Sequence, residues 1–252
     1  MVEKVFKIEG EKFDSVKLVS FGNEKPLEKT IIKHPQLIPL DVITSNPEIE
    51  FFPISSQLET SHGPLDVIGV DTYGAIYIIE TKMYSNPDRR CVTGQAQDYA
   101  CGLSTFWHDF KDFKERITRA NSGVTNKKTR LENKTLEQIV SEIPNDEEED
   151  LLKTIQKNFE NSKFTFILVF DKIDMKQIEY LKYHNEKDDN SMYALTLSKF
   201  KPIGAKYDIV ISNIYGTETA RKSQRVRNFE KWKENGESEF LKLINSNSEL
   251  TN

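Results

Sequence analysis

One aspartate and one Glu-x-Lys triplet have the residue types that metal-dependent cleavage of a phosphodiester bond requires. Asp66 is followed fourteen residues later by Glu80, Thr81 and Lys82. Mg²⁺ prefers hard oxygen ligands, so Asp66 and Glu80 could supply carboxylates and Thr81 its backbone carbonyl. The metal would activate a bound water, and Lys82 could orient that water or neutralise the charge that develops on the phosphate. We therefore expect a Mg²⁺ or Mn²⁺ site here.

A β-hairpin would bring these residues together. The sequence LDVIGVDTYGAIYIIETK contains two apolar runs around a turn signal at Asp71–Gly74. Residues two apart on a strand point to the same face, so Glu80 and Lys82 project together. Folding about the turn places Asp66 opposite residue 79 or 80. The run AIYIIE is apolar on both faces, which predicts a central strand that is covered on both sides.

An acid-x-lysine triplet is a weak signal in so charged a chain. Others occur, such as Asp109–Lys111 and Asp174–Lys176, in polar stretches with a helical pattern. Only Glu80–Lys82 ends a buried apolar strand and has an acid across the hairpin. Charged groups in such a place are costly unless they are paired or functional. Two interpretations therefore stay open, a catalytic site or a salt bridge at a strand end.

The segment GPLDVIGVDTYGAIYIIETK resembles the catalytic hairpin of the PD-(D/E)xK nuclease superfamily, with Pro64 two residues before Asp66. Gln95 and Tyr99 have the Q-x-x-x-Y form typical of the RecB-like branch, on the helix after the catalytic strand. Glu28 precedes the hairpin, where the superfamily often places a further metal-binding acid. The later sequences FTFILVFDKID and YALTLSKF resemble the strand–helix–strand that completes the core in the NucS-like branch.

This resemblance covers about residues 20–200, with low similarity at 108–160. It implies a restriction-endonuclease-like fold, a mixed sheet flanked by helices, and a Mg²⁺-dependent deoxyribonuclease of restriction, repair or phage-defence type. Gln95 would contact a phosphate or a metal-bound water, and Tyr99 would stack or hydrogen-bond near the cleaved strand. Their four-residue spacing also fits one helix face packed in the core. Glu28 would bind the metal or hold Lys82.

Basic residues indicate where phosphate could lie. Arg89 and Arg90 precede the Gln95 helix, and the run RKSQRVR has no intervening acid. From that run we expect substrate contacts by Arg221, Arg225 and Arg227. DNA is the expected partner, RNA is not excluded, and a homodimer is plausible because cutting both strands usually needs two active sites. The alternatives are a non-cleaving nucleic-acid-binding module on the same fold and a structural protein whose hairpin carries an ion pair.

The 252 residues suit one substantial domain with additions. We expect a nuclease-like domain over residues 1–215, with an N-terminal strand pair and a helical insertion at about 108–160, and a basic helical tail over 216–252. Within the insertion, five acids between Asn145 and Asp150 predict a solvated loop. The net charge of −5 argues against a purely electrostatic nucleic-acid binder.

Two further features of composition bear on the setting of the protein. No run of about 18 apolar residues occurs, so we expect no membrane span. Only two cysteines are present, which fits a reducing cytoplasm. With four histidines and no cysteine pair at ligand spacing, a structural zinc site is not expected.

Overall fold

The computed structural model describes residues 5–9, 12–87, 109–144, 148–187 and 191–217, together with Gly94 and Asp98. Its described part is a mixed α/β fold, and the expectation of a mixed sheet flanked by helices is confirmed. No helix in this part is long and apolar enough to cross a bilayer. The tail from residue 218 onward lies outside the described residues, as does most of 88–108.

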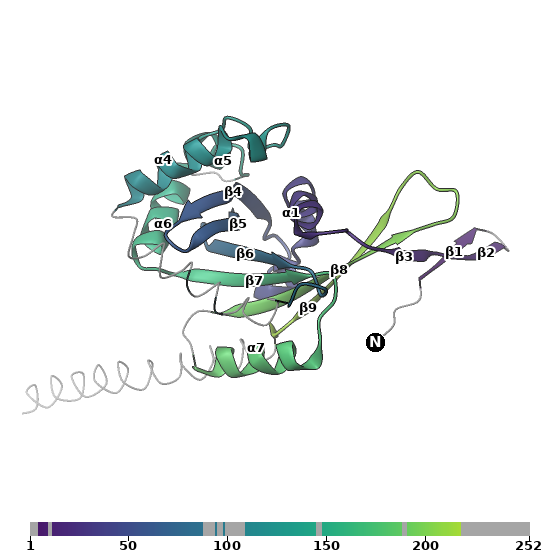
Figure 1. Cartoon of the computed structure of the whole chain (residues 1–252). Coiled ribbons are helices and arrows are strands. Elements are labelled where there is room, and N and C mark those ends of the chain that lie inside the picture. Colours follow the sequence, from purple (N-terminus) through teal and green to yellow (C-terminus); the bar gives the residue numbers. More distant parts are fainter. Residues whose placement is uncertain are drawn as a thin grey trace, which may run out of the picture.

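Seven of the described strands form one mixed sheet in the order β3-β8-β7-β6-β5-β4, with β9 paired to the other edge of β8 (Figure 1). Strands β6, β7 and β8 run parallel, and the remaining pairs are antiparallel. The strands are β3 (Lys17–Val19), β4 (Phe51–Thr60), β5 (Gly63–Asp71), β6 (Ile76–Lys82), β7 (Phe164–Phe170), β8 (Met192–Lys201) and β9 (Ile209–Tyr215). A separate two-stranded sheet precedes them, β1 (Phe6–Glu9) and β2 (Lys12–Ser15).

Helices cover both faces of the sheet, with α4 and α5 on one side and α7 on the other (Figure 1). Helix α1 packs against β5 and β6, and α7 packs against β8. The helices are α1 (Glu24–Lys33), α2 (Leu40–Thr44), α4 (Phe110–Asn121), α5 (Leu136–Val140), α6 (Glu148–Glu160) and α7 (Met175–Lys187), with short 3-10 turns η1 (Pro35–Leu37) and η3 (Val124–Asn126).

The β5–β6 hairpin forms around the carboxylate of Asp71. Its Oδ1 accepts hydrogen bonds from the backbone N–H of Tyr73 at 2.8 Å and of Ala75 at 3.0 Å. Its Oδ2 accepts one from the hydroxyl of Tyr77 at 2.9 Å. Gly74 has a φ of +81°, which L-residues with a side chain rarely adopt. The predicted turn is therefore confirmed, and its chemistry is local to the hairpin.

Strand β6 lies between β5 and β7 and is buried from Ile76 to Thr81, as its two-sided apolar pattern predicted. Because β6, β7 and β8 are parallel, their carboxyl ends meet at one edge of the sheet. Lys82, Phe170 and Thr196 form a paired row across that edge. The edge is therefore where Glu80 and Lys82 emerge.

Beyond this edge, β8 continues from Thr196 to Lys201 and pairs there with β3 and β9. We call β3 together with residues 197–211 the β arm, which projects from the body of the molecule (Figure 1). The sequence YALTLSKF predicted a strand here, and β8 includes all of it as Met192–Lys201. The last three residues of β8 pair with β3.

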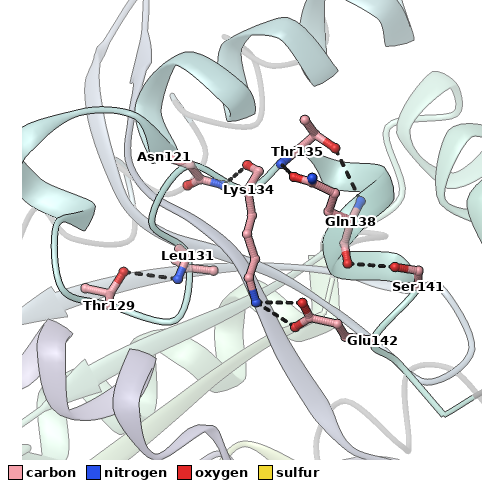
Figure 2. A network of polar contacts seen from close by, with 8 residues as sticks. All are labelled: Asn121, Thr129, Leu131, Lys134, Thr135, Gln138, Ser141 and Glu142. Carbon is pink, nitrogen blue, oxygen red and sulfur yellow. Dashed lines mark hydrogen bonds and ion pairs between the residues drawn. The ribbon is translucent and has the colours of Figure 1, made fainter.

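The described part of the insertion is held by polar contacts around Lys134, whose Nζ binds both carboxylate oxygens of Glu142 at 2.6 and 2.7 Å (Figure 2). Thr135 and Gln138 form a capping box at the start of α5. The side-chain amide of Asn121 donates to the carbonyl of Lys134 at 3.0 Å. This network orders the chain that connects α4 to α5.

The insertion is also fastened to β4. Ser55 Oγ donates to Asn121 Oδ1 at 3.1 Å, and Asn121 Nδ2 donates to the Ile54 carbonyl at 3.0 Å. Ser56 Oγ donates to Asn126 Oδ1 at 2.6 Å, and Asn126 Nδ2 donates to the Ser56 carbonyl at 3.1 Å. Both asparagines are fully buried. Residues of the insertion thus fix three consecutive residues of β4.

The acidic segment differs from its prediction as a loop. Residues 148–150 form the first turn of α6, and 145–147 lie outside the described residues. Acids are favourable at a helix N-terminus because they complement the partial positive charge of the unpaired N–H groups. A run of acids before an amphipathic segment therefore started a helix.

Candidate active site

Asp66 and Glu80 lie on neighbouring antiparallel strands. Val67 pairs with Ile79, so one step toward the open end of the hairpin Asp66 lies opposite Glu80. Opposed residues of a β-ladder share a face, so both carboxylates project to the same side. The sequence predicted residue 79 or 80 opposite Asp66, and the register shows that it is Glu80. Glu80 is 3% exposed, whereas Asp66 is half-buried.

The carboxylate of Asp66 is held from two sides. Its Oδ2 accepts hydrogen bonds from the backbone N–H of Thr81 at 2.8 Å and from the Thr81 hydroxyl at 2.7 Å. Its Oδ1 accepts one from Nε2 of Gln57 at 3.1 Å. A carboxylate has about four acceptor sites, so capacity for a cation remains. The orientation of Asp66 is therefore fixed without using up its capacity to bind a metal.

Gln57 of β4 joins the site, although sequence reasoning missed it. Its Nε2 also donates to Oε2 of Glu28 at 3.1 Å, so one amide bridges Glu28 and Asp66. Glu28 lies on the buried side of α1 and is 4% exposed. The segment FFPISSQLET gave no signal for this role, because it has the pattern of an ordinary strand.

Lys82 pairs with Glu80, at 3.2 Å from Nζ to Oε1. Glu28 was predicted either to bind a metal or to hold Lys82, and within the described residues Lys82 is held by Glu80 instead. The other oxygen of Glu80, Oε2, is buried and has no hydrogen-bond partner. A buried carboxylate oxygen without a partner is costly, so this atom marks a place where a cation or donor fits.

Burial and the charge of Asp66 raise the pKa of both glutamates of the cluster, Glu28 and Glu80. Burial, followed by the charge of Asp66, raises the pKa of Glu80 to about 8, and Lys82 opposes this only in part. Burial, again followed by the charge of Asp66, raises the pKa of Glu28 to about 7. The cluster is thus short of positive charge, which a divalent cation would supply.

A cleft of about 290 Å³ is lined by the carboxylates of Glu28 and Asp66. Glu24, at its rim, accepts hydrogen bonds through Oε1 from the Met83 N–H at 3.1 Å and from Asn86 Nδ2 at 2.9 Å. These contacts tie the first turn of α1 to the chain that follows β6. The lining residues are Asn23, Glu24, Lys25, Glu28, Gln57, Asp66 and Thr125.

The donors present suit a hard divalent cation. Within the described part of the chain, no three acid, histidine or cysteine side chains are arranged as a ready-made ligand set. The predicted set needs only two carboxylates, from Asp66 and Glu80, and the backbone carbonyl of Thr81. Mg²⁺ keeps several waters, so two or three protein oxygens are an ordinary complement for it. The unpartnered oxygen of Glu80 supports this fit.

Several predicted site residues lie outside the described residues and have no structural test. Two belong to the Q-x-x-x-Y pattern, and the others are the proposed phosphate contacts. They are Gln95, Tyr99, Arg89, Arg90, Arg221, Arg225 and Arg227. Comparison of the chain with protein-family models, curated proteins and solved structures finds no match. The function is therefore inferred from the residues of the site.

Proposed function

We propose that this chain is a metal-dependent nuclease of the PD-(D/E)xK type that hydrolyses phosphodiester bonds of DNA. The observation that carries this proposal is the pairing of Asp66 with Glu80 beside Lys82, at the end of a buried strand. Glu80 leaves one buried oxygen without a partner there. A purely structural ion pair would satisfy both oxygens of its carboxylate.

The element order supports a restriction-endonuclease-like core. Helix α1 is followed by the antiparallel strands β4, β5 and β6, and then by β7 and β8, which extend the sheet in parallel. The candidate acids lie on the hairpin in the middle of this series, and the helices α4–α6 occupy the crossover from β6 to β7. The proposed fold therefore accounts for the position of the insertion.

In this proposal Asp66, Glu80 and the Thr81 carbonyl hold Mg²⁺ or Mn²⁺, with Glu28 as a further acid beside them. A bound metal would lower the pKa of a ligated water and offset charge on the phosphate. Thr81 and Gln57 hold Asp66 in its binding orientation. Lys82 is 3.2 Å from Glu80, so its ammonium stands where it can orient an attacking water or neutralise phosphate charge.

The β arm offers a surface for the phosphate backbone. Lys17 of β3 lies directly opposite Lys201 of β8, and like charges in this position destabilise a sheet. Among the described residues no acid lies within ion-pair distance of either lysine, of Lys199 or of Lys206. An anionic partner would relieve this repulsion. In a chain of net charge −5, such a local excess of lysine favours a polyanionic substrate.

The test is cleavage of plasmid DNA with Mg²⁺ or Mn²⁺ by the full chain. We expect nicking or linearisation that disappears in Asp66→Asn and in Lys82→Ala. Glu179→Gln serves as the control, because Glu179 is an exposed acid on α7, a helix that packs against β8. DNA binding without cleavage would favour the non-cleaving module. If the chain neither binds nor cleaves DNA, a structural ion pair is favoured. Either result refutes the nuclease. Cleavage of RNA alone would correct the substrate.

A further inference from the structure

Gln57 occupies a backbone conformation that needs an explanation. Its φ is +51°, in the left-handed region that costs a residue with a side chain about 1–2 kcal/mol. Such strain persists only where the surroundings enforce it, and it gathers at functional sites. Ser56 pairs with Val67 and Leu58 with Leu65, so Gln57 stands opposite Asp66. The strained residue thus lies in one row with Asp66 and Glu80 across three strands.

The side-chain amide of Gln57 donates both of its hydrogens to carboxylates, those of Glu28 and Asp66. Its Nε2 lies 3.1 Å from Glu28 Oε2 and 3.1 Å from Asp66 Oδ1. A primary amide nitrogen has two hydrogens, so no donor remains for another partner. This amide links α1 to β5 at the point where two like charges meet in a partly buried place.

We propose that Gln57 is a positioning residue for the metal, which holds Glu28 and Asp66 convergent so that a divalent cation meets preorganised oxygens. This inference rests on the proposed function. Asp66 is then fixed by Gln57 on one oxygen and Thr81 on the other. Groups that orient metal ligands in this way contribute about 10- to 100-fold to metal affinity.

The insertion secures Gln57 in turn. Asn126 binds both the hydroxyl and the carbonyl of Ser56, the residue directly before Gln57. Asn121 binds Ile54 and Ser55 in the same stretch. These contacts fix the backbone on one side of the strained residue. They explain how an otherwise unfavourable φ is maintained.

The experiment is Mn²⁺ binding to the full chain, measured by isothermal titration calorimetry without any nucleic acid. Gln57→Gly removes the amide and also relieves the left-handed strain. Gln57→Met keeps the side-chain volume but removes the donors, and provides the test if the glycine variant does not fold. The control is Ser162→Gly, because Ser162 has the same φ of +51° in the turn before β7, away from the site.

We expect both Gln57 variants to bind Mn²⁺ at least about tenfold more weakly, with Ser162→Gly unchanged. Cleavage by the variants should recover as the Mn²⁺ concentration rises, which a merely structural role would not produce. Affinity within about twofold of wild type, whatever the change in melting temperature, overturns the positioning role and leaves the nuclease proposal intact. Absence of Mn²⁺ binding by the wild-type chain overturns the proposed function itself and this inference with it.

Discussion

Thr81 and Asp66 are joined by two hydrogen bonds to a single oxygen, from the backbone N–H at 2.8 Å and from the hydroxyl at 2.7 Å. The strand that carries Glu80 and Lys82 therefore also sets the orientation of the acid across the hairpin. This couples the backbone register of β5 and β6 to the geometry of the candidate metal ligands.

The hydroxyl of Thr81 should matter for activity. Thr81→Val keeps the shape and the backbone donor but removes one of the two hydrogen bonds to Asp66. We expect the cleavage rate at fixed Mg²⁺ to fall about tenfold, in the range found for groups that orient metal ligands. Thr81→Ser retains the hydroxyl and should stay within about threefold of wild type. Equal rates for the valine and serine variants would show that the hydroxyl does not orient Asp66.

The metal-free chain should lose stability as the pH rises. In the folded chain the pKa of Glu80 is raised from 4.5 to about 8, so folding favours its protonated form. Its stabilising contribution is full below pH 4.5 and is lost as the pH rises through 8, on the order of 5 kcal/mol over that window.

Glu80→Gln should remove this part of the pH dependence. We expect urea unfolding in EDTA to show a flatter profile between pH 5 and 8 for the variant than for wild type. Glu137→Gln is the control, since hydrogen bonds from Lys114 and from backbone outweigh burial and lower the pKa of Glu137. Its effect has the opposite sign and lies at acid pH. Parallel profiles for wild type and Glu80→Gln would contradict the raised pKa.

Metal uptake should release protons. Burial and the charge of Asp66 raise the pKa of Glu28 to about 7 and that of Glu80 to about 8, and a cation favours the ionised forms. Mn²⁺ affinity should therefore increase from pH 6 to pH 8. Calorimetry in buffers of different ionisation enthalpy measures the released protons, and Glu28→Gln should release fewer. A pH-independent affinity would place the cation away from both glutamates.

Asn126 of the insertion should contribute to the free energy of unfolding through its buried hydrogen bonds to β4. Asn126→Ala removes the partner of the Ser56 hydroxyl and carbonyl, and also the donor to the Ala120 carbonyl at 3.0 Å. Buried groups left without partners cost about 1–3 kcal/mol each, so we expect a loss of about 2–4 kcal/mol in the free energy of unfolding. Asn161→Ala, at an exposed asparagine, should change it by less than about 0.5 kcal/mol. Similar small losses for both variants would mean that the hydrogen bonds of Asn126 do not stabilise β4.

The β arm should contribute to salt-dependent DNA binding. β8 runs five residues past Thr196, about 17 Å at the usual rise per residue, which carries Lys201 well beyond the edge of the active site. Lys17→Gln with Lys201→Gln should weaken duplex binding in EDTA. The slope of log affinity against log salt should become shallower by about 0.9 for each phosphate that the variant no longer neutralises.

The matched control for the arm is Lys157→Gln with Lys163→Gln. Both lysines are exposed, and Lys163 directly precedes β7, at the opposite edge of the sheet from the site. Fluorescence anisotropy with a labelled duplex measures both pairs. If the two double variants lose affinity equally, the arm carries only general surface charge.

The hairpin could be predicted from sequence because its determinants are local. Asp71 and Gly74 build the turn, and the position of the turn sets which residues of β5 and β6 oppose one another. Counting from the turn places Asp66 opposite residue 79 or 80, and the register of the strands shows that its partner is Glu80. Glu28 was also found, through a resemblance, although its burial against the sheet depends on how α1 packs.

Gln57 could not be predicted, for a physical reason. Its left-handed φ and its contact with α1 arise from tertiary packing, and nothing in the spacing of FFPISSQLET distinguishes it from an exposed strand residue. The hydrogen bonds of Asn121 and Asn126 to β4 join residues about 70 positions apart in the chain. A single sequence does not indicate which of its distant residues are in contact.

The register of β4 against β5 shifts by one residue between Pro53 and Ser55. Carried on without this shift, the pairing that matches Phe51 with Asp71 would set Ser56, not Gln57, against Asp66. A serine side chain is too short to span two carboxylates. A single supernumerary residue in an edge strand thus selects which side chain enters the acidic cluster. If β4 paired regularly with β5 along its whole length, the hydroxyl of Ser56 would replace the amide of Gln57 beside Asp66, although no residue of the sequence had changed.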